Sequence, residues 1–120
     1  VFDQTLDVLM TRAEPLGIEI VKNSIDKINV DKSFFGIYVQ YTGKNGQIND
    51  LKSISKAISN FDIKLVVAAD LLSLTTLEKP SLFNCDVVVG TSQRFGIPLG
   101  YGGPHAGYFA TKKQYKRSIP

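Results

Sequence analysis

The sequence predicts an α/β fold with a mostly parallel sheet, because three strand-like runs alternate with segments of helical character. Two of the runs are short and apolar, residues 65–69 (Leu-Val-Val-Ala-Ala) and residues 86–90 (Asp-Val-Val-Val-Gly). Such runs are typical of strands that helices cover on both faces, as in parallel sheets. Residues 34–41 are aromatic and β-branched and predict an earlier strand. Strand, helix, strand, short helix and strand make the βαβ pattern.

The N-terminal region is predicted to hold one helix and one short strand. Apolar residues recur at helical spacing after Asp3, a candidate N-cap, and Pro15 and Gly17 close this helix. Residues 18–21 (Ile-Glu-Ile-Val) alternate loosely and predict a short strand. The polar residues 26–33 are expected to form a connection.

The remaining elements follow from the same reasoning. Residues 48–58 place isoleucines and a leucine on one face of a second helix, with lysines and serines on the other. Residues 71–77 are rich enough in leucine for a short helix, although two threonines oppose it. Residues 108–111 predict a strand, and residues 112–117 predict the start of a basic helix with a solvated face.

Composition excludes several classes of protein. The chain has 120 residues and a net charge of +3 from scattered charges, so it supports one core and shows no basic stripe for nucleic acid. The single cysteine, Cys85, and the single histidine, His105, allow no internal disulfide and no Cys/His metal cluster. No apolar run is long enough for a membrane span.

The two ends suggest a piece of a longer protein. The sequence begins Val-Phe-Asp-Gln, without methionine or the pattern of a signal peptide, and ends Arg-Ser-Ile-Pro. We therefore expect residues 1–120 to be part of one domain of a larger chain.

A glycine-rich loop follows the second apolar run. Six of the ten glycines lie within residues 90–107, where they permit positive φ angles and close approach of the backbone to a ligand or another chain. Asp70 follows the first apolar run directly. Because ligands of parallel sheets bind at the carboxyl ends of the strands, Asp70 and this loop are the two places where a site is expected.

Three common motifs do not fit the loop. It lacks the Gly-Lys-Ser/Thr string of a phosphate-binding P-loop. Gly100 and Gly102 resemble the opening of a dinucleotide fingerprint, but His105 stands where the third glycine is needed. Ser92 follows a strand as in a nucleophile elbow, but Arg94 replaces the glycine that its strained turn requires.

Three side chains remain candidates, each with a functional and a structural interpretation. Asp70 either faces a pocket and pairs with a cationic group or caps the segment that begins at Leu71. Arg94 either binds an anion or forms a structural salt bridge. His105 is either a catalytic group or a loop histidine bonded to nearby backbone.

The strings around these residues resemble one family, the P-protein of the glycine cleavage system. Residues 66–72 (Val-Val-Ala-Ala-Asp-Leu-Leu) and residues 86–106, which contain Ser-Gln-Arg-Phe-Gly-Ile-Pro-Leu-Gly-Tyr-Gly-Gly-Pro-His, carry the resemblance. Residues 40–50 and 115–120 also fit, so the similarity spans residues 34–120.

The resemblance implies the fold. Members are fold-type-I enzymes dependent on pyridoxal phosphate (PLP), with a large domain that is an α/β/α sandwich, and residues 1–120 are expected to be part of it. The family also implies two related halves, on one chain or on two subunits. Gln93 then falls where the active half carries its Schiff-base lysine. Because an amide forms no imine, no catalytic residue is expected here, and the chain is placed in the first half.

The resemblance also implies roles for the candidate residues. Asp70 stands where fold-type-I enzymes carry the aspartate that pairs with the pyridinium nitrogen of PLP, which makes it a weak candidate for cofactor binding. Arg94, Tyr101 and His105 are candidates for a loop that reaches the interface between the halves and shapes the working site from outside.

The implied activity is that of glycine dehydrogenase (decarboxylating), which decarboxylates glycine and transfers the aminomethyl group to the lipoyl arm of the H-protein. The expected partners are glycine, lipoylated H-protein and the C-terminal half or second subunit, with no nucleic acid and no membrane. The location is the cytoplasm for a bacterial source, which the residue usage favours, or the mitochondrial matrix for a eukaryotic one.

Two alternatives stay open at this point. A non-catalytic structural or regulatory paralogue of a PLP enzyme would lack the lysine in the same way. Another fold-type-I enzyme, such as an aminotransferase or a cysteine desulfurase, would need a lysine near Gln93, whereas the next one downstream is Lys112.

Overall fold

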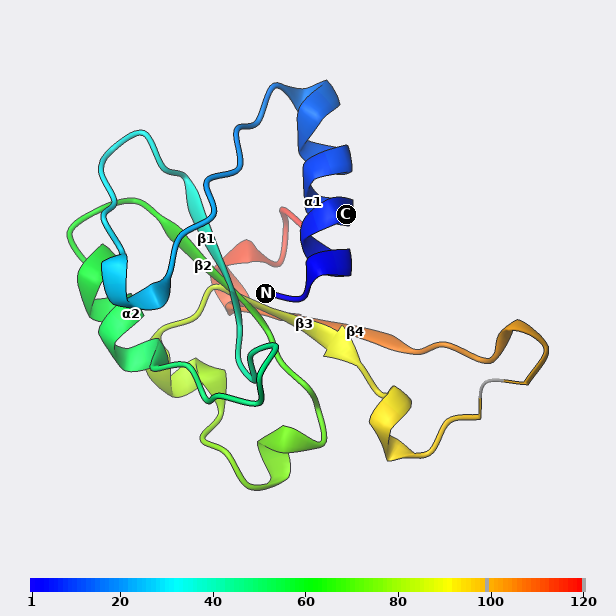
Figure 1. The fold of residues 1–120 in the computed structure, drawn as a ribbon. Coiled ribbons are helices and arrows are strands. Elements are labelled where there is room, and N and C mark those ends of the chain that lie inside the picture. Colours follow the sequence, from blue (N-terminus) through cyan, green and yellow to red (C-terminus); the bar gives the residue numbers. More distant parts are fainter. Residues whose placement is uncertain (99, 120) are drawn as a thin grey trace.

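The computed structural model describes residues 1–98 and 100–119, which form a four-stranded sheet with a helix on either side (Figure 1). Leu99 and Pro120, which belong to the strings quoted above, lie outside the described residues. The helices are α1 (Asp3–Ala13) and α2 (Leu51–Ile58). The strands are β1 (Gly36–Gln40), β2 (Lys64–Ala68), β3 (Val87–Thr91) and β4 (Gly107–Thr111).

The sheet confirms the predicted parallel arrangement. Its strand order is β1-β2-β3-β4, and β1, β2 and β3 are mutually parallel. Val67 of β2 lies opposite Val39 on one side and Val88 on the other. The glycine-rich loop turns the chain back, so β4 is antiparallel to β3 and forms an edge of the sheet.

Helix α2 starts where its N-cap dictates. The Oδ1 atom of Asp50 accepts the backbone N–H groups of Lys52 at 3.0 Å and Ser53 at 3.1 Å, which satisfies two donors of the first turn. Ile48, which the spacing placed in this helix, precedes the cap and is 60% exposed. The apolar face of the helix is buried and consists of Leu51, Ile54 and Ile58.

The core lies between α2 and one face of the sheet. The largest fully buried side chains are Leu51 and Ile54 of the helix and Leu65 and Val67 of β2. Helix α1 lies on the other side of the strands (Figure 1), and Ala13 is its one buried residue. The two faces of the sheet are therefore covered unequally by the described residues.

Two predictions about the N-terminal region are wrong. The N-cap of α1 is Phe2, and Asp3 is the first helical residue, with its carboxylate paired to Lys44. Residues 18–21 form no strand, because no described segment pairs with them and extended backbone counts as a strand only in a ladder.

Two predicted helices shrink to single turns. In residues 71–77 only Ser73–Thr75 is helical, as a 3₁₀ turn. The hydroxyls of Thr75 and Thr76 donate to the carbonyls of Leu72 and Ser73, and such local bonds compete with a longer helix. In residues 112–117 only Lys113–Tyr115 forms a 3₁₀ turn.

Candidate functional site

The carboxyl edge of the sheet gathers most of the residues predicted to matter. Asp70 follows β2 by two residues, and Gln93 and Arg94 lie in a short 3₁₀ turn just after β3. Strand β4 starts at this same edge, so Tyr108 also lies there. The parallel pairing of β2 and β3 thus brings residues more than 20 positions apart to one place.

Asp70 has two partners, and each satisfies one carboxylate oxygen. Its Oδ1 accepts the backbone N–H of Leu72 at 3.0 Å, which closes a local turn over residues 70–72. Its Oδ2 lies 3.5 Å from Nη1 of Arg94. The side chain of Arg94 is 68% exposed and that of Asp70 21%, so solvent weakens this ion pair. The salt bridge is therefore present, whereas the N-cap of the helical turn Ser73–Thr75 is Leu72 and not Asp70.

Tyr108 reaches across β3 to the end of β2. Its hydroxyl donates to the carbonyl oxygen of Ala69 at 2.6 Å. Gly90 makes this crossing possible, because a Cβ there would lie 2.2 Å from that oxygen and 2.6 Å from Cε1 of Tyr108. Burial, and next the charge of Asp70, raises the pKa of Tyr108 above its ordinary value. The ring therefore fills the space beside Asp70 as a neutral phenol.

Sequence reasoning missed Gly90 and Tyr108, although one signal was available. An isolated glycine inside a strand pattern often marks a place where another group approaches the backbone closely. Gly90 is such a glycine, at the end of Val-Val-Val-Gly. The identity of the approaching group was not readable, because Tyr108 is 18 positions away.

The side chain of Gln93 contacts backbone carbonyls at both ends of the loop. Its Nε2 lies 3.3 Å from the carbonyl oxygen of Ile97 and 3.5 Å from that of Pro104. Its Oε1 is buried and has no hydrogen-bond donor among the described residues. The side chain thus points into the loop.

Tyr101 lies in the far part of the loop and His105 lies two residues before β4, and both are exposed. Tyr101 has a φ of +50°, in the left-handed region that is unfavourable for a residue with a Cβ. The next two residues, Gly102 and Gly103, also have positive φ values. No hydrogen bond or ion pair within residues 1–98 and 100–119 joins Tyr101 or His105 to Asp70.

The opposite, amino edge of the sheet carries a buried carboxylate that the sequence did not single out. Asp86 is 8% exposed. Its carboxylate accepts the N–H of Leu65 at 2.9 Å, Nζ of Lys112 at 2.7 Å and the hydroxyl of Tyr115 at 3.0 Å. Burial acts to raise the pKa of Asp86, but these donors outweigh it and hold the pKa below its ordinary value. Lys112 is therefore a half-buried partner, with 30% of its side chain exposed, and its prediction as part of a solvated helix face is wrong.

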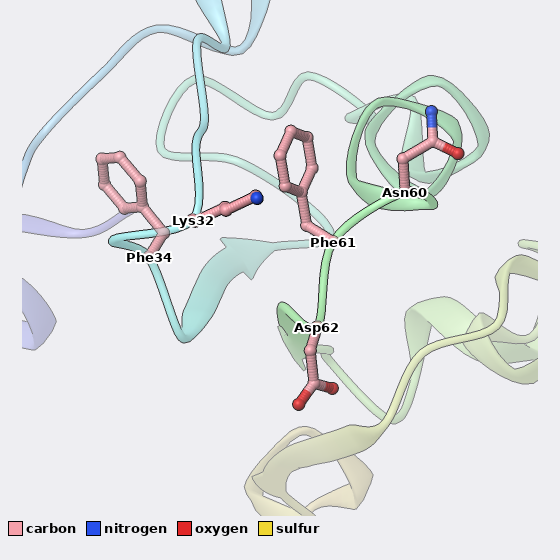
Figure 2. Close-up of a pocket in the computed structure, with 5 residues that line it drawn as sticks. All are labelled: Lys32, Phe34, Asn60, Phe61 and Asp62. Carbon is pink, nitrogen blue, oxygen red and sulfur yellow. The ribbon is translucent and has the colours of Figure 1, made fainter.

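A cavity of about 290 Å³ also lies at the amino edge. Figure 2 shows Lys32 extending between the rings of Phe34 and Phe61, while Asp62 points away from them. Asp62 is paired with Lys64 instead. The cavity is thus far from the loop and contains none of the predicted site residues.

The described residues offer little for metal chemistry. They hold no group of three or more His, Cys, Asp or Glu side chains that could bind an ion. Burial raises the pKa of the Cys85 thiol to about 11, so it is protonated at neutral pH. Within the same residues, no helix has the length and apolar character to cross a membrane.

Comparison with known proteins decides the family. The family model of the glycine cleavage system P-protein matches residues 1–120. The chain belongs to the P-protein family. Glycine dehydrogenase (decarboxylating) from Flavobacterium johnsoniae is 52% identical over 121 residues, and the match covers all of this chain. The enzymes of that name from Christiangramia forsetii and from a Nostoc species are 51% and 50% identical, and each match covers 98% of the chain.

A solved structure supports both family and fold. The structure of glycine decarboxylase (P-protein) of the glycine cleavage system, in inhibitor-bound form, matches with a TM-score of 0.85 and 30% identity over the whole chain. The resemblance and the fold class predicted from the sequence are therefore confirmed. The chain spans only 12–13% of the length of the curated P-protein relatives and 29% of the solved chain.

Proposed function

We propose that this chain works as part of a glycine dehydrogenase (decarboxylating). That enzyme decarboxylates glycine and transfers the aminomethyl group to the lipoyl arm of the H-protein. The observation that carries the proposal is the family match over residues 1–120, together with 52% identity to an enzyme of this name. Glycine, lipoylated H-protein and the rest of the protein, as a second half or a second subunit, are the partners.

In this proposal residues 1–120 are part of the large α/β/α domain. The sheet with α2 on one side and α1 on the other supports this assignment. The three relatives compared above are bacterial, which favours the cytoplasm as the location.

PLP supplies an electron sink for such chemistry, and it is held as an imine on a lysine. The residues at the carboxyl edge do not fit it. Gln93 has an amide where the resemblance places the lysine, and Lys112, the next lysine downstream, is bound to Asp86 at the other edge. Arg94 already pairs with Asp70. The proposal therefore places the cofactor lysine outside these residues and assigns no reaction step to Asp70.

The glycine-rich loop is the part of this chain proposed to act on the working site. Exposed aromatic and cationic side chains are the groups that most often anchor interfaces. Tyr101 is exposed and holds an unfavourable φ of +50°, which is typical of backbone kept for a functional reason. We place Tyr101, His105 and Arg94 at the contact with the other half of the enzyme.

The direct test is to reduce the native holoenzyme with borohydride and map the labelled lysine by mass spectrometry. Label outside residues 1–120 is expected. Label on a lysine within this chain would overturn the assignment and reopen the case for another fold-type-I enzyme. No label anywhere, with no glycine-dependent exchange of carbon dioxide, would instead indicate a non-catalytic paralogue.

The role of the loop has its own test. Tyr101→Ala and His105→Ala are expected to lower kcat/KM for glycine by about tenfold or more or to weaken association of the halves, as truncated interface anchors do. Lys79→Ala, on the connection between β2 and β3, is the control because Lys79 is also exposed. Unchanged kinetics and unchanged association in both loop variants would refute the role of the loop.

A further inference from the structure

The loop between β3 and β4 leaves the sheet as two arms, here defined as residues 93–98 and residues 103–106. The ladder between the strands ends at the pair of Thr91 with Gly107. One more backbone bond follows, from the N–H of Ser92 to the carbonyl oxygen of Ala106 at 2.9 Å. Figure 1 shows the loop, coloured from yellow to orange, extending away from the helices. The conformation of the loop must therefore depend on contacts between its own residues.

At the same place the hydroxyl of Ser92 also donates to the carbonyl oxygen of Ala106, at 3.3 Å. Farther along the loop, Gln93 is the side chain of the described residues that links the two arms. The Nε2 of Gln93 reaches the carbonyl oxygen of Ile97 on the first arm and that of Pro104 on the second, at 3.3 and 3.5 Å. Both partners are carbonyls, which only accept, so the amide nitrogen and not the amide oxygen must face them. The orientation of the side chain is thus fixed by chemistry.

This orientation leaves Oε1 buried without a donor among the described residues. A buried acceptor without a partner is unfavourable, and native structures keep few of them. The side chain holds this position in spite of that cost, which indicates that the two bonds of its nitrogen matter for the loop.

We propose that Gln93 is a positioning residue, whose amide ties the two arms of the loop together and so sets where Tyr101 and His105 lie. The consequence for catalysis rests on the proposed function, in which those two side chains meet the other half of the enzyme. The tie matters because the loop contains glycines in left-handed conformations and has few other internal bonds.

Three variants of the complete protein test the tie. Gln93→Met keeps the length of the side chain and removes both donors, whereas Gln93→Lys keeps donors that can reach the same carbonyls. Gln114→Met makes the same change on an exposed residue of the turn after β4. The readout is amide hydrogen exchange across residues 95–106, measured by mass spectrometry.

Exchange of the hydrogen-bonded loop amides, those of Phe95, Gly96 and Gly103, is expected to be about threefold faster in Gln93→Met. The effect is modest because the lost bonds are long, at 3.3 and 3.5 Å. Gln93→Lys and Gln114→Met should exchange as the parent protein does. The proposal is overturned if Gln93→Met exchanges like the parent, or if Gln93→Lys is as fast as Gln93→Met.

Glycine kinetics separate this proposal from the one it rests on. If the loop positions the working site, Gln93→Met has a lower kcat/KM for glycine than the parent protein, whereas Gln93→Lys has the same kcat/KM as the parent. Faster exchange with unchanged kinetics would support the tie and refute the role of the loop in the working site. Slower turnover with unchanged exchange would overturn the tie.

Discussion

The two edges of the sheet carry similar groups in opposite settings. At each edge an aspartate next to a central strand pairs with a cation from a segment more than 20 residues away. At the amino edge the pair is Asp86 with Lys112, at 2.7 Å, and their side chains are 11% and 30% exposed. At the carboxyl edge it is Asp70 with Arg94, at 3.5 Å, and the exposed fractions are 21% and 68%.

The exposure of each ion pair determines what its edge contributes. Asp86 is buried and binds three donors. Loss of one partner from a buried ion pair leaves an uncompensated polar group and destabilises the folded state, so the amino edge contributes to stability. An ion pair in solvent contributes little to the free energy of unfolding. The carboxyl edge and its loop are therefore where side chains are free to serve another purpose.

The largest effect is expected from Asp86→Ala. It leaves the N–H of the buried Leu65 and the ammonium of the half-buried Lys112 without their acceptor. The loss is about 3 kcal/mol in the free energy of opening of β2 and β3, measured by native-state hydrogen exchange. Asp62→Ala, whose side chain is 94% exposed, should change the same quantity by less than about 0.5 kcal/mol. Equal effects of the two variants would contradict the comparison.

The contribution of Asp86 also depends on pH in a definite direction. Its pKa lies below the ordinary value of 3.8, so the carboxylate stabilises the folded state above that pH. This contribution is lost as the pH falls through the lower pKa of the folded state. The opening free energies of the parent and of Asp86→Asn should therefore differ most near neutral pH and converge below about pH 3.8. A gap that stays constant or widens in acid would refute this.

Gly90→Ala is expected to have a smaller effect on stability. Its new Cβ would lie 2.2 Å from the carbonyl oxygen of Ala69 and would push Tyr108 off its bond. Overpacking of this kind costs about 1–3 kcal/mol, again readable from exchange of the β3 amides. Gly36→Ala is the matched control, because the nearest atom to its Cβ would be at an ordinary 3.5 Å. A control that is as destabilising as Gly90→Ala would contradict the account.

The smallest change in stability is expected from Arg94→Gln, which removes the exposed ion pair with Asp70. The opening free energy should fall by less than about 1 kcal/mol. Asp70→Asn should match it within that range, and both are measured by the same exchange experiment. A loss as large as that of Asp86→Ala would show that the two edges do not differ.

The fold could be predicted from sequence where the local residue pattern agrees with the contacts that the segment makes in the folded protein. The strands β2 and β3 are readable because each is a continuous apolar run, and α2 is readable from its apolar face. Residues 18–21 and 112–117 could not be assigned correctly, because partners distant in sequence decide them. Lys112, for example, is fixed by a carboxylate 26 positions earlier.

The candidate site could be predicted in part, where its features are local in the sequence. The position of Asp70 after a buried strand is visible in the sequence, and so is the glycine content of the loop. The pairing of Asp70 with Arg94 depends on the register of β2 and β3, which local spacing does not contain. The inward orientation of Gln93 depends on how the loop folds back. Glycine spacing does not encode this.

One paired measurement tests the contrast between the edges most directly. Tyr101→Ala and Asp86→Asn are compared in the complete protein, each for its melting temperature and for glycine-dependent exchange of carbon dioxide in the presence of H-protein. Tyr101→Ala is expected to keep the melting temperature and to lose about tenfold or more in exchange of carbon dioxide. Asp86→Asn is expected to melt at a lower temperature and to keep that exchange wherever it is folded. A stable Asp86→Asn that is inactive, or a fully active Tyr101→Ala, would contradict the contrast between the edges.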